Sequence, residues 1–293
     1  MKIGLFLPLT NPLATPEYIE TFAQAAEERG FYQLWVAEHV VLFDDYQSRY
    51  PYSADGKIVG VAPESGLLDP LVAFGAIAAV TQEIRLGTGI CLVPQRNPVY
   101  TAKEVATVDW LSDGRFTLGI GVGWLKEEFR ALGVPFEHRG SRCREYIEVM
   151  KRLWCDPVSE FKGRFYELPP CRQYPKPVQQ PHPPLVFGGE TDPALRRVAD
   201  LGSGWFGFDH TPETAAESVT RLDRLLAERG RSRDDIQVIV SPYLRPFDGE
   251  QLKRFAEAGA DQVVLLALAR DRAAIPETLD RLEQEYLTPA RTL

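Results

Sequence analysis

Two titratable side chains stand together at the end of an apolar run. In LWVAEHVV, residues 34–41, Glu38 and His39 follow four residues that are typical of a buried strand. The unperturbed pKa of an imidazole lies near neutrality, so His39 has the chemistry of a proton donor or acceptor. The competing interpretation is a structural histidine that bonds to the backbone. Glu38 is interpreted as an inward carboxylate that orients its neighbours rather than as a second catalytic acid.

The run GTGICLVPQRNP, residues 87–98, holds glycines inside a strand-like segment. Glycine weakens a strand interior and often marks a bulge or a place where a ligand comes close. Gly89 and Ile90 are therefore candidate ligand-contacting residues. Cys91 has no neighbouring cation in the sequence that would activate a thiol, so it is interpreted as a lining residue of the same site.

A second glycine-rich turn, GIGVGW at residues 119–124, also has the composition of a ligand-binding loop. Its alternating glycines let a flat ring or a phosphate approach the backbone at Gly121, Val122 and Gly123. The run does not match the G-x-G-x-x-G fingerprint, so an NAD site is not predicted.

A third turn, FGGETDP at residues 187–193, places Gly188 and Gly189 shortly before a predicted helix. Unpaired N–H groups and a helix N-terminus together form a nest that suits a phosphate. Thr191 can cap this helix and also donate its hydroxyl, whereas the carboxylate of Glu190 must point away from any phosphate.

Strand-length apolar runs alternate with helical patterns along almost the whole chain, which predicts a (β/α)8 TIM barrel. A doubly wound α/β sheet is the alternative, because strand number alone does not establish closure. In a barrel the carboxyl ends of the strands meet at one mouth, so His39 and the three glycine-rich turns would converge there. The predicted strands are residues 2–9, 32–39, 84–92, 115–123, 184–189, 204–208, 236–243 and 262–268.

Two long connections interrupt this alternation within a predicted single domain over residues 1–293. Residues 40–68 follow the second strand and carry three tyrosines, and we expect them to cover the mouth and select the substrate. Residues 158–184 hold seven prolines and lead into the fifth strand.

Composition and charge exclude several kinds of partner. The chain has 293 residues and a net charge of −8 at pH 7, so a nucleic-acid partner, which needs a basic surface, is not expected. No apolar run reaches transmembrane length and no signal peptide is apparent, so we expect a cytoplasmic protein without membrane contacts. The four cysteines form no C-x-x-C pair and no two histidines have metal-ligand spacing, so neither a metal site nor a disulfide framework is predicted.

Several ordered blocks of the sequence together resemble the bacterial-luciferase-like superfamily, and within it the oxidoreductases that depend on the deazaflavin coenzyme F420. The resemblance runs over nearly the whole chain. The blocks are AEH at residues 37–39, GTGICLVPQRNPVYTAKEVATVDWLSDGRFTLGIGVGWLKEEF at 87–129, YPKPVQQPHPPLVFGG at 174–189 and DPALRRVADLGSGWF at 192–206.

This resemblance implies a barrel whose mouth holds the isoalloxazine-type ring of the cofactor. It implies a bulge with a non-prolyl cis peptide at Gly89–Ile90 behind the ring, and a cofactor phosphate pocket over residues 188–191. The turn at residues 121–123 would line the same cavity. His39 takes the position of the catalytic or ring-adjacent proton-transfer residue.

The chain departs from the superfamily pattern at two substrate-facing positions. The sugar-phosphate dehydrogenases have a tryptophan and a glutamate where this chain has Phe43 and Trp124. We therefore predict that Phe43 and Trp124 bind the substrate, and that the substrate is more apolar than a phosphosugar. Gly121 stands where bacterial luciferase has a cysteine, so light emission is not expected.

The cofactor residues would suit either F420 or FMN, and the full-length pattern is closer to the F420-dependent members. With F420, hydride would move between ring C5 and a small organic substrate while His39 supplies or removes a proton. The alternatives are a monooxygenase that uses reduced FMN and a non-catalytic flavin-binding barrel.

The helical segments 71–80 and 100–111 carry more apolar surface than one barrel face needs, and superfamily members pair through this region, so we expect a homodimer.

Overall fold

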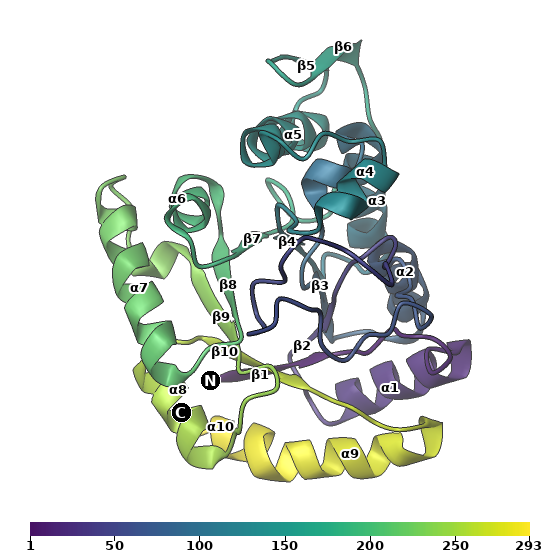
Figure 1. The fold of residues 1–293 in the computed structure, drawn as a ribbon, viewed down its shortest axis with the longest axis vertical. Helices are drawn as coiled ribbons and strands as arrows, with labels where there is room; N and C mark the ends of the chain where they lie inside the picture. Colours follow the sequence, from purple (N-terminus) through teal and green to yellow (C-terminus); the bar gives the residue numbers. More distant parts are fainter.

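Eight parallel strands close into a barrel in the computed structural model, which describes all 293 residues (Figure 1). Strand β1 pairs with its successor β2 and also with the last strand, β10, and this double pairing closes the ring. The predicted (β/α)8 barrel is confirmed, and the open doubly wound sheet is excluded. In ring order the strands are β1 (Lys2–Phe6), β10 (Gln262–Leu266), β9 (Gln237–Ser241), β8 (Gly204–Phe208), β7 (Leu185–Gly188), β4 (Phe116–Ile120), β3 (Arg85–Thr88) and β2 (Gln33–Val36).

Helices surround the barrel, and several begin where the sequence provides a cap. Asp69 and Asn97 each precede a proline, and their side chains accept hydrogen bonds from the first free N–H groups of α2 and α3. No helix combines the length and the apolar character that crossing a bilayer requires. The helices are α1 (Pro16–Glu28), α2 (Pro70–Val80), α3 (Pro98–Leu111), α4 (Lys126–Ala131), α5 (Arg139–Cys155), α6 (Asp192–Leu201), α7 (Pro212–Ala227), α8 (Gly249–Glu257), α9 (Ile275–Leu282) and α10 (Thr288–Ala290).

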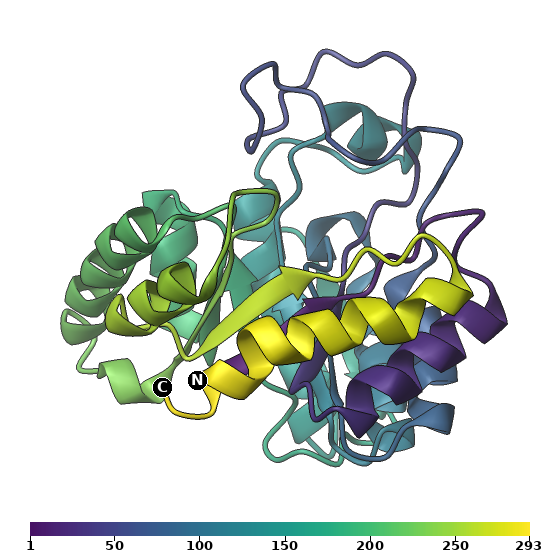
Figure 2. The ribbon, with the colours of Figure 1, turned by 90° about the horizontal axis from the view of Figure 1, so that it is seen from below.

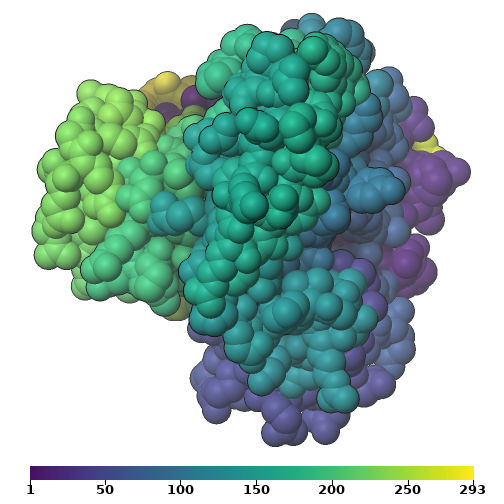
Figure 3. All heavy atoms as spheres, turned by 90° about the horizontal axis from the view of Figure 1, so that it is seen from above, coloured from purple at the N-terminus to yellow at the C-terminus, as the bar shows by residue number.

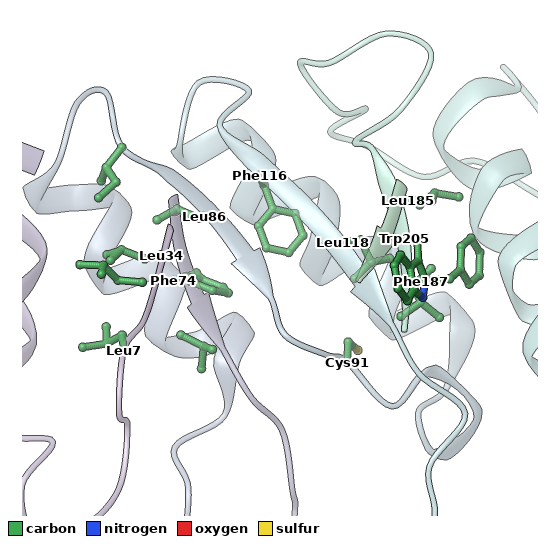
Figure 4. Packing of buried hydrophobic residues seen from close by; sticks show 14 of the residues in the cluster. Leu7, Leu34, Phe74, Leu86, Cys91, Phe116, Leu118, Leu185, Phe187 and Trp205 are labelled. Carbon is green, nitrogen blue, oxygen red and sulfur yellow. The ribbon is translucent and has the colours of Figure 1, made fainter. Parts of the chain in front are cut away.

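Alternate residues along the strands divide the core into two layers. In β2, Leu34 and Val36 belong to the layer between barrel and helices, whereas Trp35 points into the barrel. Figure 4 shows part of the outer layer, where Phe74 of α2 meets Phe116 of β4 with ring centroids 5.7 Å apart. Strands β3 and β4 contribute no large apolar side chain to the inner layer. That layer consists of Phe6, Trp35, Val186, Phe206, Ile239 and Val264.

The first long connection, residues 40–68, contains no helix and no strand, and we call it the lid. In Figure 2 the lid arches over the end of the barrel where α4 lies. This is the end at which the strands finish, so the lid stands over the barrel mouth, as predicted.

The second long connection contains two strands that the sequence analysis did not predict. Residues 158–184 contain an antiparallel hairpin of β5 (Ser159–Lys162) and β6 (Glu167–Cys171). Proline cannot donate to a strand ladder, so Pro169 and Pro170 conceal β6 in the sequence. The hairpin lies beyond α5, and both occupy the middle of the face seen in Figure 3.

Candidate active site

His39 lies at the barrel mouth, three residues after the end of β2. Its Nδ1 is 3.1 Å from Oε2 of Glu128, which stands on α4. An ionised carboxylate only accepts hydrogen bonds, so Nδ1 carries the proton and Nε2 is the ring nitrogen left for chemistry. The side chain of His39 is 10% exposed and that of Glu128 is 0% exposed, so the pair is shielded from bulk water.

Glu128 is ionised despite its burial. Burial alone would raise its pKa, but hydrogen bonds from His39, Gln95 and the Val40 N–H outweigh that effect and lower the pKa from its ordinary value. Gln95 Nε2 donates to Oε2 at 3.0 Å, and the Val40 N–H donates to Oε1 at 2.7 Å. Glu128 therefore fixes both the imidazole and the first residue of the lid.

Sequence reasoning did not identify Glu128 as a site residue. It stands 89 positions from His39, and nothing in a linear pattern joins the two. One signal was available, because Leu125, one helical turn earlier, is buried and places Glu128 on the inner side of α4. A carboxylate on such a buried face requires a partner.

Glu38 bonds away from the mouth. Its Oε2 accepts a hydrogen bond from the Leu92 N–H at 2.5 Å, and its Oε1 accepts from Arg96 Nε at 2.6 Å. Arg96 also pairs with Asp69, the cap of α2. The interpretation of Glu38 as an orienting carboxylate is confirmed, because it ties the chain after β3 to the end of β2.

The peptide between Gly89 and Ile90 is cis, as the sequence resemblance implied. The side chain of Ile90 extends across the turns that follow β4 and β7. A Cβ added to Gly188 would lie 2.7 Å from Ile90 Cδ1, and one added to Gly121 would come closer still. The structure therefore brings the three predicted glycine-rich turns into contact at the mouth.

Cys91 is placed differently from its expected position as a lining residue. Its side chain is 0% exposed and belongs to the outer layer of the core (Figure 4). Burial, and then the neighbouring Glu38, raise the pKa of its thiol well above the ordinary value. The residue packs between barrel and helices, so it does not line the mouth.

The turn after β7 has the free amides of an anion site. Gly189 adopts a φ of +100°, which lets the chain turn into α6. The N–H groups of Glu190, Thr191 and Asp192 donate no hydrogen bond within the protein. Thr191 occupies the N-cap position, but its side chain makes no capping bond, so its hydroxyl is also free. Free amides at the start of a helix suit a phosphate.

The carboxylate of Glu190 is directed toward the lid and β8. It accepts hydrogen bonds from the hydroxyl of Tyr52 at 3.2 Å and from the Phe208 N–H at 3.3 Å. Buried His210 Nε2, which has no hydrogen-bond partner, lies 3.7 Å away. Burial, and then Glu190 itself, raise the pKa of Tyr52, so its hydroxyl remains a donor. Glu190 therefore connects the lid to the barrel.

Aromatic rings fill the space beside His39 under the lid. The ring centroid of Trp124 lies 5.8 Å from that of His39, 5.6 Å from Tyr46 and 5.2 Å from Tyr50. Phe43 and Trp124 both line a cavity of about 180 Å³ whose walls are mostly apolar. A larger cavity of about 450 Å³ lies elsewhere, between α3 and the hairpin, and shares none of these residues.

A barrel of this kind, with this mouth, matches a known family. The family model described as luciferase-like monooxygenase matches residues 1–280. The chain belongs to the luciferase-like monooxygenase family. An uncharacterised protein of Mycobacterium tuberculosis is 34% identical over 267 residues, which cover 90% of this chain and 91% of that one. An FMNH2-dependent dimethylsulfone monooxygenase of Pseudomonas putida is 31% identical over 244 residues, which cover 81% of this chain and 60% of that one.

Solved structures share the barrel of the family. The coenzyme F420-dependent tetrahydromethanopterin reductase of Methanopyrus kandleri superimposes with a TM-score of 0.75 over 98% of each chain, at 19% identity. This likeness shows the fold alone. Membership makes the chain a luciferase-like oxidoreductase or monooxygenase, and because these two similar proteins use FMNH2 and F420, membership alone does not distinguish the two cofactors.

Proposed function

We propose that this chain is an F420-dependent oxidoreductase in which His39 exchanges a proton with the substrate. The observation that carries the proposal is the pairing of His39 with a buried, ionised Glu128, which leaves Nε2 free at the mouth. When hydride leaves an alcohol carbon or reaches a carbonyl carbon, a proton must move at the oxygen. A histidine held in one orientation at the mouth is suited to that transfer.

The residues around the mouth suit a flavin-like cofactor. The N–H groups of residues 190–192 would hold its phosphate, because they are free and point from a helix start. Gly89, Ile90 and the turn at residues 121–123 would lie beside the ring. When bound, F420 supplies a hydride donor or acceptor at ring C5.

His39 would act at the substrate oxygen. In the oxidation direction Nε2 takes the hydroxyl proton, and the imidazolium that results is stabilised by Glu128 at 3.1 Å. In the reduction direction Nε2 returns that proton. The hydrogen bond from Gln95 holds the carboxylate of Glu128 in place in both the oxidation and the reduction direction. The lid and Trp124 would exclude water from the reacting atoms.

The substrate is proposed to be a small molecule with an apolar body. Phe43 and Trp124 line the same small cavity under the lid, together with other apolar side chains. The polar side chains in the walls of this cavity are those of Asp44, Tyr46 and Lys57, and most of the walls are apolar, which suits an apolar body better than a sugar with several hydroxyl groups.

A second candidate is a monooxygenase that uses reduced FMN. The similarity to the FMNH2-dependent enzyme of Pseudomonas putida favours it. The free amides after β7 would hold the FMN phosphate equally well. This candidate requires molecular oxygen for turnover, whereas hydride transfer with F420 does not.

Equilibrium titration of the purified chain with F420 and with FMN tests the choice. We expect saturable F420 binding and, with small apolar alcohols or ketones, turnover that continues without oxygen. Absence of F420 binding at tens of micromolar, with oxygen-dependent turnover on reduced FMN, would establish the second candidate instead.

We also propose that two copies associate through α2 and α3. Large apolar side chains on these helices are exposed, with Val72 76% and Trp110 59% accessible. Tyr100 and Leu111 of α3 are similarly exposed. Large exposed apolar side chains on two neighbouring helices are a feature of protein interfaces.

A further inference from the structure

Three arginines gather where α5 begins against α6, and none of them forms an ion pair. They are Arg139 and Arg142 of α5 and Arg197 of α6. The carboxylate of Asp200, one turn further along α6, already pairs with Arg144 and Arg229. In a chain with a net charge of −8, a basic cluster without acidic partners is unusual.

The three guanidinium groups differ in how far the protein satisfies them. Arg142 is buried and donates to the main-chain carbonyls of Pro94 and Glu137, so its role is structural. Arg139 donates only from Nε, to the Gly123 carbonyl at 3.0 Å, and its guanidinium lies over the ring of Phe136, 3.8 Å from the centroid. Both Nη atoms of Arg139 make no hydrogen bond, and only Arg197 has neither a hydrogen bond nor an aromatic partner.

Arg197 makes no hydrogen bond within the protein, although its side chain is partly buried. Its Nη1 lies against the first turn of α5, 3.4 Å from the position of a Cβ added to Gly140. Burial lowers its pKa. Burial, and then the charges of Arg197 and Arg142, also lower the pKa of Arg139. A partly buried positive charge without a partner is unfavourable, and an anion would relieve it.

The cluster adjoins the proposed cofactor site on two sides. Gly123, which Arg139 holds, ends the turn that follows β4. The helix that carries Arg197 begins with the free amides of residues 190–192. The acidic side chain of Glu137, next to α5, is exposed and lies 3.9 Å from Lys126. An anionic chain that leaves the phosphate site between α6 and the turn at Gly123 would therefore meet Arg139 and Arg197.

We propose that Arg139 and Arg197 bind carboxylates in the tail of the cofactor, beyond the phosphate held by the amides. This inference rests on the proposed function. FMN ends at its phosphate, whereas the tail of F420 continues through a phosphodiester into several carboxylates. The planar fork of arginine matches a carboxylate. The cluster would thus select the deazaflavin over FMN.

Titration with three deazaflavin forms tests the proposal. The first form lacks the phosphate, the second has the phosphate without glutamate, and the third carries several glutamates. We expect wild type to bind the third form roughly tenfold more tightly than the second, the effect of one charge-assisted pair. Arg197→Ala should abolish this preference and leave affinity for the second form unchanged. The preference should also weaken in high salt.

Arg196→Ala is the matched control, because Arg196 is the neighbouring residue on α6 and is exposed. It should keep the wild-type preference. Arg197 makes no hydrogen bond, so its removal should preserve the fold, and Arg197→Gln provides a second variant of similar size. A melting temperature near that of wild type verifies this.

Two results would overturn the proposal. One is equal wild-type affinity for the second and third forms. The other is an Arg197→Ala variant that also loses affinity for the second form, which has the phosphate without glutamate. That result would show that the arginines bind the phosphate rather than the tail. If no deazaflavin form binds, the proposed function fails as well. If all forms bind without a tail preference, only the role of the arginines fails.

Discussion

A single buried carboxylate, Glu128, gives His39 its proposed role. The sequence indicated the histidine, because it stands at the end of a recognisable strand. It did not indicate the glutamate, since the contact joins positions 89 residues apart. Local patterns predict which residues reach the mouth, and tertiary packing decides which of them meet.

Replacement of His39 by asparagine tests proton transfer. The amide of asparagine can bond to Glu128 but does not exchange protons near neutral pH. We expect turnover to fall by about 10²-fold or more, with little change in cofactor affinity. His138→Asn is the matched control, because His138 is exposed and asparagine tolerates its φ of 56°. Unchanged turnover in His39→Asn would indicate a different proton donor, whereas a wild type without any turnover would indicate a binding barrel.

Glu128→Gln tests the charge of the carboxylate through stability. The folded-state pKa of Glu128 lies below its ordinary value of 4.5, so its ionised form stabilises the fold. This stabilisation is complete above pH 4.5 and is lost as the pH falls through the folded-state value. Urea unfolding across this range should show that the free energy of unfolding of wild type exceeds that of Glu128→Gln above pH 4.5, and that this difference shrinks in acid.

Glu64→Gln serves as the control for this experiment. Glu64 is exposed in the lid, so Glu64→Gln should leave the free energy of unfolding close to that of wild type. A difference in unfolding free energy between wild type and Glu128→Gln that does not change with pH would show that Glu128 is not the ionised partner of His39.

The short helix α4 controls the lid through two consecutive glutamates. Glu128 binds the first residue of the lid, and Glu127 binds its middle. The Gln47 N–H donates to Glu127 Oε1 at 2.8 Å, and Ser48 Oγ donates to Oε2 at 2.7 Å. The lid has no secondary structure of its own, so its order depends on these contacts together with the Tyr52–Glu190 bond and the aromatic packing on Trp124.

Glu127→Ala should therefore loosen the lid. Loss of these hydrogen bonds is expected to speed tryptic cleavage after the exposed Arg49 by about tenfold. Glu64→Ala, which removes an exposed lid carboxylate, should leave the rate unchanged. Equal cleavage of Glu127→Ala and wild type would show that the lid is held by its aromatic packing alone.

Elements with caps and strong periodicity could be predicted from the sequence, and one element could not. Asp69 and Asn97 before prolines mark the starts of α2 and α3, and the apolar runs mark all eight barrel strands. The hairpin of β5 and β6 was missed because its prolines oppose a strand assignment, and its packing on α5 overrides that preference. In this hairpin, tertiary contacts determine the strand structure more strongly than the local sequence preference does.

At the scale of the whole molecule, barrel closure brings together turns that are far apart in the sequence. Large apolar side chains from six strands fill the inner layer, and β3 and β4 contribute none. Glycines at these strand ends made the location of the site predictable. The orientation of Cys91 was not, because it lies beyond the end of β3, where the alternation of faces along a strand no longer predicts which side a residue occupies.

Association of two copies is the prediction at this scale. Sedimentation should give a mass of two chains of 32.9 kDa for wild type. Trp110→Glu places a charge in the proposed interface and should yield monomers. Leu268→Glu alters an exposed leucine outside α2 and α3 and should remain dimeric. A monomeric wild type would refute the dimer.

The most direct test of the proposed active site is a crystal structure of the chain with bound F420. We predict the cofactor phosphate within about 3 Å of the N–H groups of residues 190–192. The ring should lie against Gly89 and Ile90, with His39 Nε2 facing the substrate side of C5. Amides of residues 190–192 that face bulk solvent, or a ring bound away from His39, would contradict the proposed site.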